Sequence, residues 1–442
     1  MLARLKALIA FALYLLAVTV LLPLLPLRLW WRARKAPAYR QRIAERFGIS
    51  RIAPRSDGIW VHAVSVGETF AAAPTVRALQ QRYPDRAITI TTTTPTGSAQ
   101  VRSLFGDSVS HVYAPYDWPL CVWLFVRRVR PALLVVMETE LWPVTILLCR
   151  ALSIPVLIAN ARLSAKSARG YRRISWLLQP TLQKTWVAAQ HQHDAERFLA
   201  LGTDAGRLQV TGSVKFDVEL APALRESATS WRNACHASGK ELIWIAASTH
   251  EGEDEAALQA HAQLLQQHPT ALLILVPRHP ERFNSVAMLI AAQGLRAVRR
   301  SACGKGEDAG VEAGECVQAD TQVLLVDTLG ELLMFYGVAD AAFVGGSLVP
   351  VGGHNYLEPA SWGLPVVSGP HTHNFAHIAA LLRDHYVLRE VQSADELGAA
   401  VIDVLNDEDY QQRACAAALE LLADNRGASQ RLLEFICARL DD

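Results

Sequence analysis

The sequence has 442 residues, of which 51% are hydrophobic and 19% are charged; this composition excludes a disordered chain, and the length predicts two domains. The net charge of +1 conceals a division, because residues 1–216 contain 28 Lys and Arg against 11 Asp and Glu (+17), and residues 217–442 contain 15 against 31 (−16). The basic first half predicts an anionic partner, either a membrane or a nucleic acid. The seven cysteines include no Cys-x-x-Cys pair, which argues against a zinc site or a disulfide framework and indicates a reducing compartment.

The first forty residues favour the membrane over nucleic acid. Residues 8–27 carry no charge, and as a helix they would span roughly 30 Å, the thickness of the hydrocarbon core. Two tryptophans and a basic cluster follow, which is typical of a membrane interface with the rest of the chain on the cytoplasmic side. We therefore expect residues 1–45 to form a single N-terminal anchor with a basic segment that contacts anionic lipids. Pro23 and Pro26 leave open a kinked helix that lies in one leaflet.

Apolar runs typical of buried strands then alternate with helical segments. The predicted strands are 58–64, 87–93, 132–137, 154–160, 184–189 and 208–211 in the first half, and 241–247, 271–276, 323–326, 341–344 and 364–367 in the second. This alternation predicts parallel sheets with helices on both faces. The fold class is therefore α/β, with two doubly wound, Rossmann-like domains at 46–218 and 219–442 that face a cleft. The polar segment 301–318 is predicted to be a surface loop.

Glu68 is the first candidate for chemistry. It ends the loop after the first strand, in His62-Ala-Val-Ser-Val-Gly-Glu68, and ligands of doubly wound sheets bind beyond the carboxyl ends of the strands. A carboxylate there would face the cleft and could take a proton from an attacking hydroxyl. The alternative is a glutamate that only stabilises the N-terminus of its helix.

A pair of carboxylates follows the third predicted strand, in Met137-Glu-Thr-Glu-Leu-Trp-Pro143. Buried carboxylates are costly unless they are paired. Arg162, in Asn160-Ala-Arg-Leu-Ser164, or Lys215, in Gly212-Ser-Val-Lys-Phe-Asp217, would supply the positive charge from a neighbouring strand end. Glu138 and Lys215 are therefore candidate site residues, and a purely structural ion-pair network is the alternative.

The second half contains a glycine-rich loop, Gly345-Gly-Ser-Leu-Val-Pro-Val-Gly-Gly-His-Asn-Tyr-Leu-Glu358, between a strand and a predicted helix. Such a loop lets the backbone approach a ligand and points free N–H groups at an anion. Glu358, in the first turn of the helix, could accept hydrogen bonds from a ribose diol. The loop therefore predicts a nucleotide site, with a capping role for Glu358 as the alternative.

Two further segments of the second half suit a phosphate. Arg278 follows a predicted strand in Pro277-Arg-His-Pro280, and Thr328-Leu-Gly-Glu331 precedes a helix whose N–H groups suit an anion. The histidines at 371, 373 and 377 could bind a metal only with a further ligand in geometry, so lining of a pocket is favoured. We expect no metal and no cofactor, since fixed N–H and arginine donors could stabilise the phosphate charge.

These segments together resemble the bacterial 3-deoxy-D-manno-octulosonic acid (Kdo) transferases of lipopolysaccharide synthesis, over nearly the whole chain. The resemblance implies a GT-B fold and the transfer of Kdo from CMP-Kdo to the lipid A precursor, lipid IVA, at the cytoplasmic face of the cell inner membrane. By the family pattern Glu68 corresponds to the catalytic base, and Glu138 and Lys215 to residues that stabilise the transition state. The CMP-binding segments correspond to Pro277, Arg278, Leu329, Gly330, Glu331, Asn355, Tyr356, Leu357 and Glu358.

Three other functions remain to be weighed. Another GT-B transferase could use a UDP-sugar, and a two-lobed binding protein could capture a nucleotide sugar without a reaction. The paired acidic and basic candidates of the first half argue against a mere binder. A membrane-tethered nucleic-acid binder is disfavoured, because the sequence lacks the aromatic and basic motif of an RNA-binding module, so we expect no nucleic acid as a partner.

Overall fold

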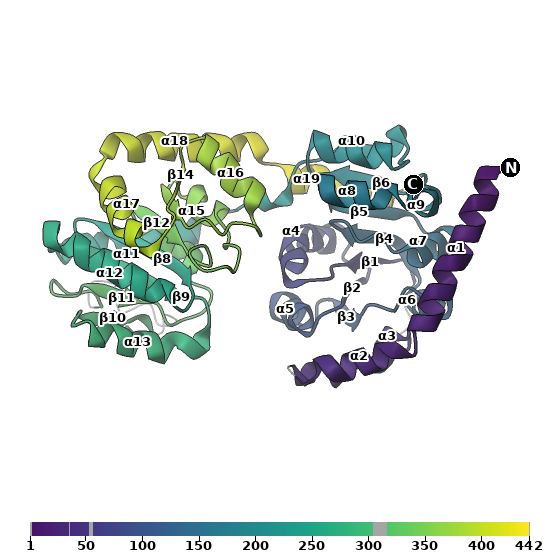
Figure 1. Ribbon diagram of the computed structural model, residues 1–442, viewed down its shortest axis with the longest axis horizontal. Coiled ribbons are helices and arrows are strands. Elements are labelled where there is room, and N and C mark those ends of the chain that lie inside the picture. The colour runs from purple at the N-terminus through teal and green to yellow at the C-terminus, as the bar shows by residue number, and fades with distance from the viewer. Residues whose placement is uncertain (1, 35, 53–55, 304–315, 442) are drawn as a thin grey trace. The chain divides into compact units, whose positions relative to one another are not determined.

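A computed structural model describes residues 2–34, 36–52, 56–303 and 316–441, which divide into two compact units (Figure 1). Unit 1 comprises Met1–Asp217 and Asn425–Asp442, and unit 2 comprises Val218–Asp424. In the described part of the chain each unit contains one seven-stranded sheet whose strands pair in parallel. The predicted α/β class with two parallel-sheet domains is confirmed. The middle of the predicted loop at 301–318 lies outside the described residues.

The sheet of unit 1 has the strand order β3-β2-β1-β4-β5-β6-β7. Its strands are β1 (Gly58–His62), β2 (Ile88–Thr92), β3 (Ser110–Tyr113), β4 (Pro131–Met137), β5 (Val156–Ala161), β6 (Trp186–Ala189) and β7 (Leu208–Val210). Its helices are α1 (Leu2–Leu21), α2 (Leu24–Arg32), α3 (Ile43–Arg46), α4 (Val66–Arg82), α5 (Pro95–Phe105), α6 (Pro119–Val129), α7 (Pro143–Ala151), α8 (Ala165–Arg172), α9 (Ser175–Leu182), α10 (Gln192–Ala200) and α19 (Ala428–Cys437). The strand order reverses between β1 and β4, so a crevice is expected at their carboxyl ends.

The sheet of unit 2 has the order β10-β11-β9-β8-β12-β13-β14 and reverses between β8 and β12. Its strands are β8 (Ile243–Thr249), β9 (Leu272–Pro277), β10 (Ala297–Arg299), β11 (Val323–Leu325), β12 (Ala341–Val344), β13 (Val366–Ser368) and β14 (Leu388–Glu390). Its helices are α11 (Pro222–Ala237), α12 (Glu253–Gln267), α13 (Phe283–Ala292), α14 (Leu332–Tyr336), α15 (Leu357–Ser361), α16 (Ala376–Asp384), α17 (Ala394–Asn406) and α18 (Glu408–Asn425).

The sequence analysis missed the strands β3, β10 and β14. Each has only three or four residues and lies at an edge of its sheet. Edge strands are covered on fewer sides, so polar residues such as His111, Arg299 and Glu390 interrupt the apolar run that identifies a buried strand.

The N-terminal segment is not one continuous helix over residues 8–27, but it has the kink that Pro23 and Pro26 left open. The chain bends between α1 and α2, next to Pro23, so that Phe11–Leu21 and Leu24–Arg32 meet at 54°. No helix in the described ranges is by itself long and apolar enough to cross a membrane, although this bent pair together meets the length and composition. The helix α1 lies beside α7 and α9 of unit 1 (Figure 1), and the Tyr14 hydroxyl donates a 2.7 Å hydrogen bond to Asp117.

Two cysteines form a pair that the sequence analysis did not predict. Cys303 and Cys316, 13 positions apart, lie side by side with their Cα atoms 5.2 Å apart, whereas the sequence analysis argued against a disulfide framework. Their spacing matches no framework or metal pattern, which is why the sequence alone gave no indication of the pair.

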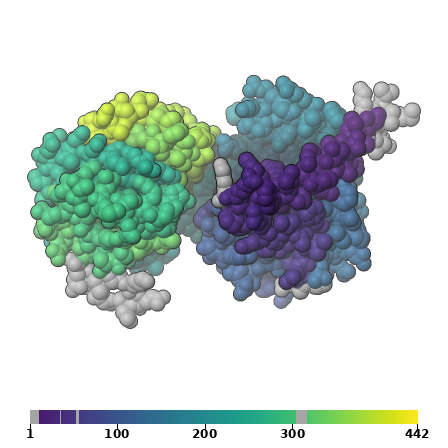
Figure 2. All heavy atoms as spheres, turned by 60° about the horizontal axis from the view of Figure 1, so that its bottom comes forward, coloured from purple at the N-terminus to yellow at the C-terminus, as the bar shows by residue number. Residues whose placement is uncertain are grey.

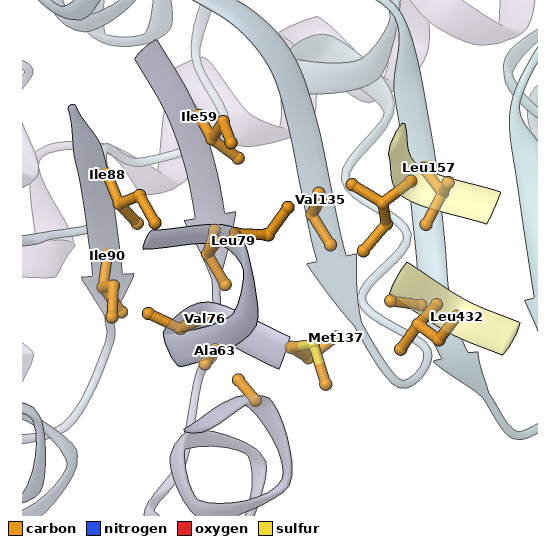
Figure 3. Close-up of a cluster of buried hydrophobic side chains, with 14 of the residues drawn as sticks. Ile59, Ala63, Val76, Leu79, Ile88, Ile90, Val135, Met137, Leu157 and Leu432 are labelled. Carbon is orange, nitrogen blue, oxygen red and sulfur yellow. The ribbon is translucent and has the colours of Figure 1, made fainter. Parts of the chain in front are cut away.

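The last segment of the chain also differs from the prediction, which assigned residues 425–442 to the second domain. Helix α19 instead packs on the sheet of unit 1, where Leu432 lies beside Leu157 of β5 (Figure 3). The carboxylate of Asp217 accepts hydrogen bonds from the backbone N–H groups of Gly427 (2.7 Å) and Ser429 (2.5 Å), which fixes the start of the helix. The chain therefore returns to complete the core of unit 1.

Leu432→Ala should destabilise unit 1 by roughly 2–5 kcal/mol, because Leu432 is fully buried and its removal leaves a cavity. Hydrogen-exchange mass spectrometry in increasing urea should show peptides of β4 and β5 losing protection at lower urea, while those of β8 and β9 do not change. Leu419→Ala, at a leucine of α18 that is 44% exposed, is the control. Unchanged protection in β4 and β5 would contradict the packing of α19 on unit 1.

Candidate active site

Glu68 lies at the start of α4, directly after β1, where the strand order of unit 1 reverses. Ser65 precedes the helix and its hydroxyl accepts a 3.4 Å hydrogen bond from the Glu68 N–H. The Glu68 carboxylate in turn accepts from the Val64 N–H at 2.7 Å and from the Ser65 hydroxyl at 3.0 Å. The local sequence Ser-x-x-Glu forms a capping arrangement that holds the carboxylate at the edge of the sheet. Glu68 therefore does stabilise the N-terminus of its helix, which was the structural alternative to a chemical role.

Capping alone does not account for the electrostatics of Glu68. The residue is only 8% exposed, and burial raises the pKa of its carboxyl to about 7 against the lowering effect of the Val64 N–H. The negative charges of Glu138 and Glu140 raise that pKa further. A carboxyl whose pKa is near neutrality is suited to exchange a proton at physiological pH.

Glu138 and Lys215 form the ion pair that the sequence suggested. Glu138 follows β4 with a left-handed backbone (φ 57°), and its carboxylate lies 3.4 Å from the Lys215 ammonium. Both side chains are nearly 30% exposed (28% and 29%), so the pair is accessible to a ligand. Asn160 of β5 places Lys215, because its side-chain oxygen accepts from the Val214 N–H at 3.3 Å. Arg162, the other predicted partner, is exposed and forms no ion pair with a described carboxylate.

A second carboxylate, Glu140, lies beside an aromatic and histidine pair. It accepts a 2.7 Å hydrogen bond from the Trp142 indole, and burial raises its pKa. The Trp142 ring meets the His62 ring edge-on at 5.8 Å, and burial lowers the pKa of His62 to about 4. The cavity beside these residues has a volume of about 10 Å³, which is room for one water molecule and not for a sugar.

The glycine loop of unit 2 is built differently from the prediction. The carboxylate of Glu253, which is fully buried, accepts hydrogen bonds from the backbone N–H groups of Gly346 (2.7 Å), Ser347 (2.9 Å) and Leu348 (2.9 Å). It also accepts from the His250 N–H at 3.0 Å. The expectation that this part of the loop offers free N–H groups to an anion is wrong, because a protein carboxylate already occupies them.

Glycine is nevertheless required at the start of this loop. A Cβ atom on Gly345 would lie 2.6 Å from the Ser248 carbonyl oxygen, and Gly346 has a left-handed backbone with φ +67°. The close approach between the ends of β8 and β12 therefore needs small residues. Further along the described loop, the backbone N–H groups of His354, Asn355 and Tyr356 have no hydrogen-bond partner.

Three histidines gather at the carboxyl ends of β8 and β9, near Arg278. The His250 and His354 rings lie parallel, with a hydrogen bond of 2.9 Å between their Nε2 atoms, and His279 meets His250 edge-on. Burial, and then the charge of Arg278, lowers the pKa of His354 to about 4, so this ring is neutral at pH 7. Arg278 is exposed and has no ion-pair partner among the residues that the structure describes, so its guanidinium is available for an anion.

The predicted nucleotide-binding residues of the loop differ in whether their side chains are accessible to a ligand. Asn355 donates to Glu358 at 3.0 Å, and burial raises the pKa of the Glu358 carboxyl. The Tyr356 side chain is fully buried and its hydroxyl lies 2.8 Å from that of Ser368. Leu357 is fully buried as well. Tyr356 and Leu357 therefore support the loop, and only their backbone can contact a ligand.

Glu331, from the predicted phosphate-binding segment 328–331, already has an ion pair within the protein. Arg300 pairs with its carboxylate at 2.7 Å, and Thr328 also donates to it. Gly330 has φ +89°, and Leu329 is 74% exposed. Pro277 ends β9 and is buried, so it positions Arg278 without a polar contact of its own.

The histidines at 371, 373 and 377, which the sequence left open as metal ligands, do not form a metal centre with other described residues. No group of three or more His, Cys, Asp or Glu in the described ranges is arranged to hold a metal ion. His371 instead donates its backbone N–H to the Ser347 carbonyl at 2.9 Å and so borders the glycine loop.

Comparison with solved structures defines the fold. The chain is similar to MurG of Acinetobacter baumannii, with a TM-score of 0.54 and 11% sequence identity, over 87% of this chain and 100% of that chain. It is similar to MnaA of S. aureus with a TM-score of 0.52 and 14% identity, over 87% and 97%. These neighbours show that the chain has the GT-B fold of two parallel-sheet α/β domains.

Comparison of sequences shows the family. Residues 41–218 match the family described as 3-Deoxy-D-manno-octulosonic-acid transferase (kdotransferase). The chain is 46% identical to the 3-deoxy-D-manno-octulosonic acid transferase of Haemophilus influenzae over 91% of this chain and 92% of that protein. It is 36% identical to the Bordetella pertussis protein of the same name, over 96% and 98%. The chain belongs to the Kdo transferase family, and it is a glycosyltransferase.

Glu253→Gln should loosen the glycine loop, because an amide cannot accept the four N–H groups that the carboxylate holds. We expect the loss of at least one charge-assisted hydrogen bond, about 1.5–3 kcal/mol, seen as faster hydrogen exchange in residues 345–353. Glu251→Gln, at an exposed neighbouring glutamate, is the control and should leave exchange unchanged. Equal exchange in both variants would show that Glu253 does not hold the loop.

Proposed function

We propose that this protein transfers Kdo from CMP-Kdo to the lipid A precursor, lipid IVA, in lipopolysaccharide core synthesis at the cytoplasmic face of the inner membrane. The observation that carries the proposal is Glu68, a buried carboxyl with a pKa of about 7 beside the Glu138–Lys215 pair, in a chain of the Kdo transferase family. The reaction class needs such a base, because the acceptor hydroxyl must lose a proton as it attacks.

In the proposed step, the acceptor oxygen forms a bond to the anomeric carbon of Kdo while the bond from that carbon to the CMP phosphate breaks. Glu68 takes the hydroxyl proton, and the CMP phosphate leaves with the electron pair of the broken bond. Positive charge develops on the sugar, and the Glu138 carboxylate is placed to stabilise it. Lys215, 3.4 Å away, balances and orients Glu138.

Unit 2 has the groups that a departing cytidylate needs. Arg278 lacks a carboxylate partner, and the N–H groups of His354, Asn355 and Tyr356 lack hydrogen-bond partners in the described structure. These donors are fixed before the phosphate arrives, so they stabilise its charge with little reorganisation. Glu358, oriented by Asn355, is available for the ribose hydroxyls. We assign CMP-Kdo to this set of residues.

The proposed membrane location is supported by the N-terminal helices. Leu13, Leu16 and Val20 of α1 are 57%, 61% and 64% exposed, and Trp30 and Trp31 of α2 are 47% and 62% exposed. Figure 2 displays this N-terminal segment at the surface of unit 1. Exposed apolar side chains in this number favour insertion into a lipid phase, and the basic residues that follow favour anionic lipids.

Glu68→Gln should reduce kcat by roughly 10²–10⁴-fold, because an amide cannot accept the acceptor proton, and should leave the affinity for CMP unchanged. Transfer is measured by mass spectrometry of lipid IVA after incubation with CMP-Kdo, and CMP binding by calorimetry. Glu196→Gln, at an exposed glutamate of α10, is the control. Wild-type turnover in Glu68→Gln would remove Glu68 from the mechanism. Transfer from UDP-N-acetylglucosamine in place of CMP-Kdo would favour the UDP-sugar alternative.

The pH dependence of kcat/KM should report the same carboxyl. Glu68 is protonated below its raised pKa of about 7, so kcat/KM should fall about tenfold per pH unit below that value. Glu140→Gln removes a negative charge that raises this pKa, so the acidic limb should move to lower pH. A limb that stays in place in Glu140→Gln, with the fold intact, would mean that another group controls it.

A further inference from the structure

A second cavity of unit 1 lies at the opposite edge of the sheet from Glu68. It has a volume of about 450 Å³ and is bordered by the end of α7 and by the segments that enter β5, β6 and β7. Three of its lining residues are cationic, Arg150, Lys184 and Arg207, and a fourth is Trp186. None of the described lining residues is acidic. We call this cavity the basic groove.

The three cations of the basic groove lack carboxylate partners in the described part of the chain. The Arg150 guanidinium donates to the Pro180 carbonyl oxygen of α9. Arg207 donates to the Lys184 carbonyl oxygen at 3.5 Å, and its guanidinium lies 4.5 Å from the centroid of the Trp186 ring. The Lys184 ammonium is exposed. The groove therefore holds a concentration of positive charge that the protein itself does not neutralise.

The sequence around the groove explains this lack of compensation. Residues 141–193 contain seven Lys and Arg and no Asp or Glu. Asp204, the acidic residue nearest to Arg207 in the sequence, uses its carboxylate to accept the Gly206 N–H at 2.9 Å within its own turn. Burial and the charge of Arg207 both lower the pKa of Arg150. Clustered like charges of this kind are stabilised when an anion binds among them.

We propose that the basic groove binds the phosphate of an anionic phospholipid headgroup. Two guanidinium groups and an ammonium suit phosphate oxygens. The Trp186 ring, against which the Arg207 and Arg439 guanidinium groups lie, holds one of these cations in place. A lipid is favoured over a free phosphate by the surroundings: α9, to which Arg150 is bonded, packs against α1, and Leu152 beside the groove is 47% exposed. The inference deepens the proposed membrane location and rests on it.

The proposal predicts how unit 1 meets the bilayer. The helix α1 runs beside α7 and α9 (Figure 1), and Tyr14 and Thr19 tie it to Asp117 and Trp118 at 2.7 Å and 3.0 Å. A helix held in this way is expected to enter the membrane surface together with the body of unit 1. The basic groove then supplies a second, electrostatic contact on the same side of the unit.

The test uses the full-length protein and vesicle flotation without CMP-Kdo. Vesicles of phosphatidylcholine alone are compared with vesicles that also contain phosphatidylglycerol. Lys184→Gln/Arg207→Gln should weaken binding to the anionic vesicles by about fivefold for each cation, roughly 25-fold in total, and should not change binding to the neutral ones. Lys184→Gln alone, at an exposed side chain, should give the fivefold effect even where the double variant folds poorly.

The matched control is Lys166→Gln/Arg169→Gln, which removes the same charge from two exposed residues of α8 outside the groove. An equal loss in this control, or no loss in the groove variants, would overturn the proposal. Binding of millimolar glycerol 3-phosphate to the wild type but not to the groove variants, with equal vesicle binding in all of them, would identify a small phosphate ester as the ligand and overturn the lipid assignment. Transfer assayed in detergent should be the same in wild type and groove variants, so a failure of the proposed transfer reaction is seen separately.

Discussion

The reversal of strand order in each sheet is the constraint on which the candidate site of each unit depends. In unit 1 it separates the loops after β1 and β4, and in unit 2 the loops after β8 and β12. Neighbouring strands whose connections leave in opposite directions open a crevice at their carboxyl ends. Glu68 and Glu138 follow the two strands at the first reversal, and Glu253 and the glycine loop follow the two at the second. Side chains separated by 70 or more positions are thereby brought to one edge.

The two units use a carboxylate at this point in opposite ways. Glu253 accepts four backbone N–H groups, so its charge is consumed in fixing the loop after β12. Among the residues that the structure describes, Glu68 accepts hydrogen bonds from the Val64 N–H and the Ser65 hydroxyl alone. It lies close enough to Glu138 and Glu140 for their charges to act on it. Burial without full compensation is what raises the pKa of its carboxyl to about 7. The difference in hydrogen bonding therefore separates a carboxylate that fixes a loop from one whose pKa is near neutrality.

Sequence patterns could predict those features whose causes are local. The apolar runs identified eleven strands, and Ser65 with Glu68 has the spacing of a helix cap. The role of Glu253 depends on contacts with residues 93 to 95 positions away, and nothing in its own segment indicates them. The return of α19 to unit 1 is invisible for the same reason, because Leu432 has the same apolar pattern whichever sheet it covers. The sequence places Asn160 at a strand end but does not predict its contact with the segment of Lys215. The Asn160 side chain accepts a hydrogen bond from the Val214 N–H, next to Lys215, and Asn160 has a left-handed backbone (φ 51°).

The attachment of α1 links the helix with the exposed apolar side chains to the loop that carries Glu138. Asp117, only 5% exposed, accepts from the Tyr14 hydroxyl and also from the Val144 and Thr145 N–H groups at the start of α7. The residues just before α7 are the loop from Glu138 to Trp142. The buried Asp117 carboxylate therefore holds both α1, which has the exposed apolar side chains, and α7, which follows the loop that carries Glu138. Because a buried carboxylate needs its donors, displacement of Tyr14 would leave Asp117 partly unsatisfied at the first turn of α7. The geometry of the Glu138 loop and the seating of α1 thus depend on the same hydrogen bonds, which is a reason for α1 to be packed on the domain and not joined to it by a free linker.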